Sequence, residues 1–176
     1  MGNRNFINGQ WQDSSNGQEY EQRNPADLIE VTGIWPKSSV EDVASAIEAA
    51  ATAFVSWRGL TVYQRAEYFA KVLQVMKSRV EQIAAVITAE NGKTLKESKG
   101  EIESAIKEME FQIGEGLRMA GEVMPSGHNG VMAYSMRRPL GVVAVISPWN
   151  FPFKPELWIR TQEKRPTCRW DNSFVL

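Results

Sequence analysis

The chain has little of what disulfide-rich, metal-binding and membrane proteins are built from. Its 176 residues include one cysteine, Cys168, and one histidine, His128. A lone cysteine excludes an intramolecular disulfide framework and a multi-cysteine metal site, and it favours a reducing, cytoplasmic setting. No stretch approaches the roughly 20 apolar residues that a membrane helix requires, and the first residues lack the apolar core of a signal peptide. We therefore expect no membrane partner.

The charge balance is almost neutral, and this argues against nucleic acid as a partner. Twenty basic residues stand against twenty-one acidic ones, for a formal net charge of −1. The basic side chains are scattered rather than gathered on one face, so no strong positive field is expected. With 43% apolar residues, the composition is that of a globular protein of one domain or a little more.

The first 37 residues predict one short hairpin followed by loop. Residues 5–12 are two short apolar stretches joined by Asn8-Gly9, a pair that tolerates the positive φ angles of a two-residue hairpin turn. Residues 13–37 are rich in Ser, Asn, Gly and Pro. We expect them to be mostly connecting loop, with a short strand at 28–32.

Four helices are predicted between residues 40 and 117. Apolar residues recur at three- and four-residue steps in each segment, and Ser39 with Asp42 and Thr61 with Gln64 supply start signals. Asn91-Gly92 has the form of a C-terminal cap for the third helix. The fourth helix is expected over 95–117. We interpret all four apolar stripes as core packing.

Two strands are predicted after these helices. Residues 131–138 alternate imperfectly between polar and apolar, and residues 141–146, Gly-Val-Val-Ala-Val-Ile, form a continuous apolar run that Ser147-Pro148 ends. Such a run is typical of a strand buried on both faces of a parallel sheet. Parallel neighbours need crossovers of a dozen or more residues, and thirty residues follow Ile146. The sequence therefore predicts a strand whose partner sheet it does not supply.

Three candidate sites have simpler explanations. Gly114-Glu115-Gly116 begins like a dinucleotide fingerprint, but a third glycine is missing at 119 and a helix rather than a strand precedes it. His128 lies in a Gly-rich stretch with no acidic or cysteine neighbour, which favours a surface loop. Arginines flank Cys168 and would lower the pKa of its thiol. Without a base or an oxyanion donor, Cys168 is interpreted as a reactive thiol and not as a nucleophile.

The turn 147–152, Ser-Pro-Trp-Asn-Phe-Pro, is different in kind. A predicted strand ends in a turn between two prolines, and Asn150 is the one side-chain amide within it. Ligands bind at the carboxyl ends of strands in open α/β sheets. A carboxamide fixed there can donate a hydrogen bond to a developing oxyanion without adding charge. The alternative is a structural asparagine that caps its own turn, and the residues alone leave both interpretations open.

The same region resembles a known family. The sequence PLGVVAVISPWNFP at 139–152 is similar to the motif at the first cofactor-domain strand of the NAD(P)-dependent aldehyde dehydrogenases, and FINGQW, NPAD and ENGKTLKE earlier in the chain agree with it. The resemblance covers residues 4–153. It implies an α/β fold in which an N-terminal hairpin and helical part accompany the first strand of a Rossmann-like cofactor domain that is incomplete.

The resemblance also implies roles for individual residues. Asn150 resembles the asparagine that helps hold the oxyanion of the thiohemiacetal intermediate. Four neighbouring residues resemble the lining of the nicotinamide and ribose side of the NAD or NADP pocket: Ile146, Ser147, Pro148 and Trp149. Residues 122–138 resemble a hairpin of the oligomerisation domain, which implies a homo-oligomer. The substrate implied is an aldehyde.

Two residues that the chemistry of the family needs have no counterpart in this chain. The family needs a cysteine nucleophile in a Gly-Gln-x-Cys setting and a glutamate base in a Glu-Leu-Gly-Gly setting. Cys168 lies in neither, so the role is not transferred to it. We divide the chain into an aldehyde dehydrogenase-like part, 1–153, and an off-pattern tail, 154–176. A deletion, frameshift or truncation would explain the tail.

Three hypotheses follow from this division. In the first, the chain is a truncated homologue that is inactive alone. In the second, it is a binding or regulatory fragment that associates with a full-length homologue through 122–138 or an exposed helix face. In the third, the natural protein is longer and is an ordinary active semialdehyde dehydrogenase. Intact-mass measurement on the native protein distinguishes the third hypothesis from the others.

Overall fold

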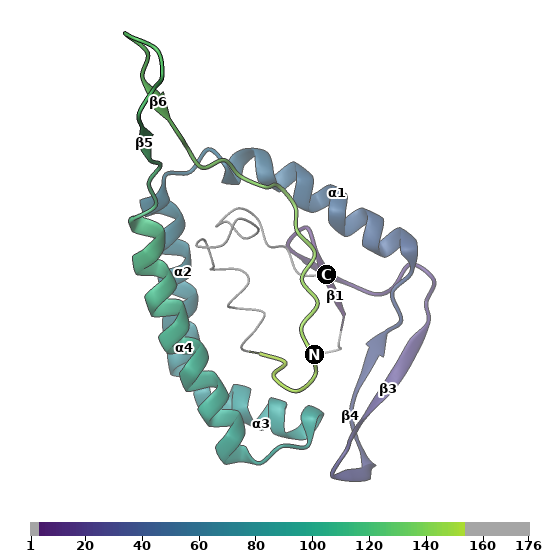
Figure 1. Ribbon diagram of the computed structural model, residues 1–176. Coiled ribbons are helices and arrows are strands. Elements are labelled where there is room, and N and C mark those ends of the chain that lie inside the picture. Colours follow the sequence, from purple (N-terminus) through teal and green to yellow (C-terminus); the bar gives the residue numbers. More distant parts are fainter. Residues whose placement is uncertain (1–3, 154–176) are drawn as a thin grey trace.

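The computed structural model describes residues 4–153 (Figure 1). Within them lie four helices and three two-stranded antiparallel sheets. In chain order the elements are β1 (Asn5–Ile7), β2 (Gln10–Gln12), β3 (Glu19–Asn24), β4 (Asp27–Pro36), α1 (Val40–Trp57), α2 (Val62–Ser78), α3 (Val80–Asn91), α4 (Leu95–Leu117), β5 (Val123–Met124) and β6 (Ala133–Tyr134).

The hairpin of β1 and β2 confirms the prediction for residues 5–12. Asn8 and Gly9 have φ angles of 53° and 76°, which are the positive values that a two-residue turn between antiparallel strands requires. Phe6 pairs with Trp11 across the hairpin, and their ring centroids lie 4.8 Å apart.

The second hairpin, β3 with β4, corrects the expectation that residues 13–37 are mostly loop, whereas the short strand predicted at 28–32 lies within β4. The two strands pair from Glu19 opposite Pro36 to Asn24 opposite Asp27. The side-chain oxygen of Asn24 accepts a hydrogen bond from the backbone N–H of Ala26 at 2.9 Å and so shapes the turn. Strand β3 is polar and mostly exposed, so it carries no apolar alternation, and the backbone ladder with β4 defines it instead.

Capping interactions fix the starts of three helices. Ser39 and Asp42 form the predicted reciprocal capping box at α1, and Thr61 and Gln64 form the one at α2. Thr94 and Glu97 form a capping box at the start of α4 as well. At the end of α3, Gly92 adopts a left-handed conformation with φ of 79°, which confirms the predicted cap.

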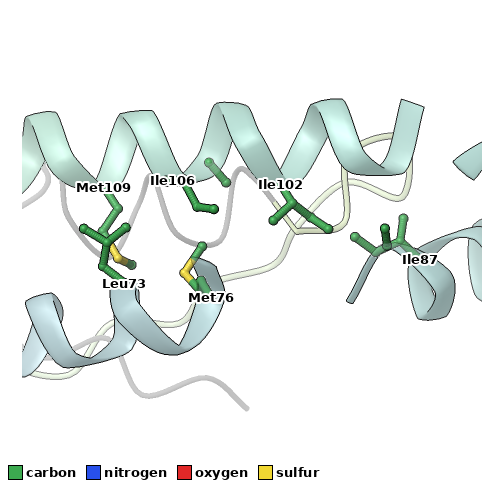
Figure 2. Packing of buried hydrophobic residues seen from close by; sticks show 8 residues of the cluster. Leu73, Met76, Ile87, Ile102, Ile106 and Met109 are labelled. Atoms are coloured by element: carbon green, nitrogen blue, oxygen red, sulfur yellow. The ribbon is translucent and has the colours of Figure 1, made fainter. Parts of the chain in front are cut away.

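The core lies between α2, α3 and α4. Figure 2 shows Met109 of α4 beside Leu73 of α2, with Ile102 and Ile87 further along the same layer. The buried cluster consists of Leu73, Met76, Ala84, Ile87, Ile102, Ala105, Ile106 and Met109. The predicted stripes of these three helices are therefore confirmed as core.

The structure of α1 corrects the prediction that the apolar stripes of all four helices pack in the core. Val43 and Ile47 belong to the apolar stripe that predicts a core face for this helix, yet both are exposed. The hydrophobic side chains of α1 that are buried are those of Ala46 and Ala50. In Figure 1, α1 stands apart from the pair formed by α2 and α4. An apolar stripe indicates which face of a helix can be buried. Burial also requires another element that covers that face.

The segment after α4 contains the third hairpin and an extended stretch. Val123 pairs with Tyr134, and Met124 with Ala133, so a hairpin forms within 122–138 but its strands are shorter than the expected 131–138. Residues 141–146 differ from the predicted strand, because Val143 makes an isolated bridge and no ladder forms. Residues 4–153 offer no parallel neighbour to pair with the stretch, and the ladder needs one.

Candidate functional site

The predicted turn lies against the junction of α3 and α4. After β6 the chain passes α1 and reaches the level of α3, where residues 147–153 lie (Figure 1). The backbone N–H of Phe151 donates to the carbonyl oxygen of Pro148 at 3.4 Å and closes the turn. Asn150 lies between Pro148 and Phe151 in this turn, and it is exposed.

Two side chains, one from the last residue of α3 and one from the loop between α3 and α4, bind the turn through its backbone. The side-chain amide of Asn91 donates to the carbonyl oxygen of Trp149 at 2.7 Å. The ammonium of Lys93 donates to the carbonyl oxygen of Asn150 at 2.9 Å, and it also lies 4.8 Å from the centroid of the Phe151 ring. Because Gly92 between them adopts the left-handed conformation, the chain reverses there, and both side chains reach the turn.

Glu101 holds both the lysine and the end of the turn. One carboxylate oxygen accepts a hydrogen bond from Lys93 Nζ at 2.7 Å, and the other accepts one from the backbone N–H of Phe153 at 2.8 Å. The Glu101 side chain is 1% exposed and that of Lys93 is 13% exposed. A buried carboxylate with an ammonium and an amide as donors has its charge balanced and its oxygens satisfied.

The sequence interpretation missed these three residues. The sequence indicates Asn91 as part of a helix cap, and it indicates no role for Lys93 or Glu101. One signal was available for Glu101. It falls on the apolar stripe of the fourth helix, one residue before Ile102 and four before Ala105, where a carboxylate needs a partner to be buried.

The carboxamide of Asn150 has no hydrogen-bond partner among residues 4–153, whereas its own backbone carbonyl is bound by Lys93. The turn is closed by a backbone hydrogen bond between Phe151 and Pro148. This arrangement disfavours the alternative in which Asn150 caps its own turn. A neutral amide that is exposed beside a fixed backbone remains able to donate to a ligand.

The residues expected to line a cofactor pocket lie directly before the turn. Ile146 is 90% exposed and Trp149 is 85% exposed, whereas Ser147 is half-buried and Pro148 is exposed. Val145 is buried, so the stretch is held on one side while its apolar side chains face outward on the other. The stretch therefore presents an exposed aliphatic and indole surface directly before the turn.

The other sequence candidates are not brought to this turn. His128 is exposed in the loop between β5 and β6, which confirms the surface-loop interpretation. Gly114 and Gly116 lie inside α4 and form no phosphate-binding loop. Cys168 falls outside the described residues. In the part of the chain that the structure describes, no group of acidic, histidine and cysteine side chains could hold a metal ion.

Within residues 4–153, neither a surface depression nor a membrane-spanning helix adds a candidate site. A shallow open depression on α1 is lined by Glu48, Ala51, Thr52, Val55 and Ser56, and none of the turn residues borders it. No helix in the described residues is both long and apolar enough to cross a membrane.

Comparison with known proteins gives one consistent result. The model of the aldehyde dehydrogenase family matches residues 11–159. The chain is 44% identical over 172 residues to the α-ketoglutaric semialdehyde dehydrogenase of Bacillus subtilis, which covers 98% of this chain and 34% of that protein. It is 39% identical over 155 residues to malonate-semialdehyde dehydrogenase 1 of Bacillus licheniformis, covering 88% of this chain and 32% of that protein.

Solved structures agree. The succinate-semialdehyde dehydrogenase of Burkholderia pseudomallei matches with a TM-score of 0.84 and 34% identity, over 88% of this chain and 32% of that one. A betaine aldehyde dehydrogenase variant from Staphylococcus aureus in complex with NAD+ matches with a TM-score of 0.86 and 28% identity, over 92% of this chain and 32% of that one. These neighbours support the incomplete α/β fold that the sequence predicted.

The extent of the matches bears on the division of the chain. This chain spans about a third of the length of the proteins that it matches. The family match continues past Phe153 to residue 159, and the 172 matched residues in the Bacillus subtilis comparison reach into 154–176. The boundary at 153 and the origin of the tail stay predictions.

Proposed function

Because the chain belongs to the aldehyde dehydrogenase family, we propose that it serves the oxidation of an aldehyde to a carboxylic acid with NAD+ or NADP+, and that Asn150 is its oxyanion donor. One observation carries this proposal. The backbone of the turn is bound by Asn91, Lys93 and Glu101, while the carboxamide of Asn150 keeps its donors available among residues 4–153.

Asn150 would act when the aldehyde carbonyl becomes tetrahedral. Addition of a thiolate to the carbonyl carbon moves the π electrons onto oxygen, and an amide N–H directed at that oxygen stabilises the charge. A single preorganised donor of this kind commonly contributes about 10²- to 10³-fold in rate. Its neutrality matters, because a neutral amide neither requires a counter-charge nor depends on pH.

The cofactor side of the site is assigned to residues 146–149. When bound there, NAD+ or NADP+ would accept the hydride that leaves the tetrahedral carbon. Ile146 and Trp149 would contact its nicotinamide and ribose through their exposed apolar surfaces, and Ser147 and Pro148 would shape the backbone beside them. An apolar lining also keeps water from the reacting carbon.

We propose a semialdehyde as the substrate class. The two relatives named above act, by their names, on α-ketoglutaric and malonate semialdehydes, and a similar solved structure is a succinate-semialdehyde dehydrogenase. We further propose that the 176-residue chain is inactive by itself in its expected cytoplasmic setting, because Cys168 does not have the sequence setting of the family's nucleophile and no glutamate has that of its base.

A turnover assay tests this proposal. The pure chain is incubated with NAD+ or NADP+ and a panel of semialdehydes and simple aldehydes, and reduced cofactor is measured. We expect none above the background of a Cys168→Ala control. Turnover clearly above that control would contradict the proposed inactivity and would return Cys168 to consideration as a nucleophile.

A second candidate function, a module that binds a full-length homologue, is favoured by the hairpin of β5 and β6. It projects from the end of α4 in Figure 1, and Val123, Met132 and Tyr134 on it are exposed. Apolar side chains on an exposed edge are suited to pairing with another chain. Copurification with a full-length aldehyde dehydrogenase at fixed stoichiometry would support this function, and a monodisperse folded monomer would contradict it.

The tail 154–176 has a separate test. If a deletion, frameshift or truncation changed the natural continuation, the coding DNA past codon 153 should encode further aldehyde dehydrogenase sequence in one of its frames. Finding no such sequence in any frame would contradict this origin for the tail.

A further inference from the structure

We propose that Asn91, Lys93 and Glu101 form a three-residue anchor that positions Asn150. The inference rests on the proposed oxyanion role of Asn150 and assigns to these residues a part in it. They are positioning residues, because among the described residues their contacts with the turn are made to its backbone and to the Phe151 ring and not to the carboxamide of Asn150.

The contacts of the anchor lie on both sides of Asn150. Asn91 binds the carbonyl of Trp149, which precedes Asn150, and Lys93 binds the carbonyl of Asn150 itself. Glu101 binds the N–H of Phe153 at the far end of the turn. Three points of attachment spread over five residues restrict both translation and rotation of the turn. All three are made to backbone atoms, so the Asn150 side chain is left out of them.

The buried ion pair supplies the strength of the anchor. Lys93 and Glu101 meet at 2.7 Å with side chains that are 13% and 1% exposed. Hydrogen bonds that involve a charged group are roughly twice as strong as neutral ones. Burying such a pair is costly, and an apolar pair of the same volume often stabilises a fold as well or better. Stability alone therefore explains the pair poorly, whereas directed bonds to a turn require charged or polar groups.

The anchor is attached to the hydrophobic core of α2, α3 and α4. Glu101 lies in the second turn of α4 beside Ile102, whose side chain is fully buried in the core. Phe153, which Glu101 binds, also packs against that core. Groups that are fixed on a packed helix hold a site more precisely than groups on loops. The packed core of α2, α3 and α4 thus fixes the position of the turn through Glu101 and Lys93.

Amide hydrogen exchange, followed by NMR on the full chain, tests the anchor. The informative amide is that of Phe151, because its partner is the carbonyl of Pro148 and not an anchor residue. In Lys93→Met we expect exchange at Phe151 to accelerate by at least about tenfold, while core amides of α2 and α4 keep their rates. The matched control is Lys77→Met, because Lys77 forms an exposed ion pair with Glu110; it should leave Phe151 unchanged.

Unchanged exchange at Phe151 in Lys93→Met would overturn the inference. So would acceleration only in proportion to the core amides, because that pattern indicates loss of global stability rather than release of the turn. If Lys93→Met does not fold, Asn91→Ala decides, since it removes one exposed anchor contact and should accelerate Phe151 by a smaller factor. This readout needs no turnover, so a failure of the anchor and a failure of the proposed function are distinguished.

Discussion

The carboxylate of Glu101 accepts a hydrogen bond from the backbone N–H of Phe153 at 2.8 Å, across 52 positions of sequence. This contact joins the longest helix of the described residues to the end of the turn that carries Asn150. The same carboxylate binds Lys93, which in turn binds the carbonyl of Asn150. The candidate oxyanion donor is therefore connected to the hydrophobic core by two consecutive charge-assisted contacts.

Gly92 should not tolerate a side chain. Its φ is 79°, and an added Cβ would lie 2.7 Å from Cγ of Pro25. We expect Gly92→Ala to lower the free energy of unfolding by about 1–2 kcal/mol from the left-handed conformation alone, with the contact to Pro25 adding to it. Urea denaturation measures the loss.

The control for this substitution is Gly100→Ala. Gly100 lies inside α4 with nothing within 4 Å of its added Cβ. Alanine there should raise the free energy of unfolding by roughly 0.5–1 kcal/mol, because glycine is a poor helix former. Equal effects of the two substitutions would contradict the account of Gly92.

Ile102 should stabilise the fold through the burial of its side chain. It is fully buried between α2, α3 and α4, so Ile102→Ala leaves a cavity and should cost about 2–5 kcal/mol in denaturant unfolding. Ile29 on β4 is 89% exposed, and Ile29→Ala should change stability by no more than about 0.5 kcal/mol. A cost for Ile102→Ala as small as that of the control would place the core elsewhere.

Because of Asp42, the free energy of unfolding should decrease in acid. Hydrogen bonds from the Ser39 backbone and the Ser14 side chain hold the pKa of its carboxyl well below the ordinary range. A depressed pKa in the folded state adds stability that is fully present above the unfolded pKa of about 4 and is lost as the pH falls below it. The direction is therefore destabilisation in acid.

The comparison of wild type with Asp42→Asn isolates this contribution. The wild-type chain should be the more stable one near neutral pH, and the difference between the two should shrink as the pH is lowered below about 4. Unfolding by urea at a series of pH values measures it. A difference that stays constant across the series would mean that the Asp42 charge is not responsible.

Features with local causes could be predicted from the sequence. Asn8-Gly9 required a turn, Ser39 with Asp42 started a helix, and Asn91-Gly92 ended one, because each signal involves neighbours in the chain. The position of Asn150 in a turn also followed from the two prolines around it. The role of Asn150 stays a prediction.

Features that depend on tertiary partners could not be predicted in this way. The polar strand β3 is defined by its ladder with β4 and not by a pattern of its own. The exposed stripe of α1 looks like a core stripe until the covering element is known. Glu101 falls on the apolar stripe of α4 and so needs a partner, but the sequence does not identify that partner, because Lys93 and Phe153 lie 8 and 52 positions away.

The role of Asn150 is tested most directly in a hybrid enzyme. Residues 1–153 are joined to the remaining two thirds of the Bacillus subtilis relative, which shares 44% identity with this chain, and aldehyde oxidation is measured in the active hybrid. The account predicts that Asn150→Ala lowers kcat by about 10²- to 10³-fold with little change in KM. Asn129→Ala in the exposed loop between β5 and β6 should leave kcat unchanged. An Asn150→Ala hybrid that keeps the kcat of its parent would contradict the account.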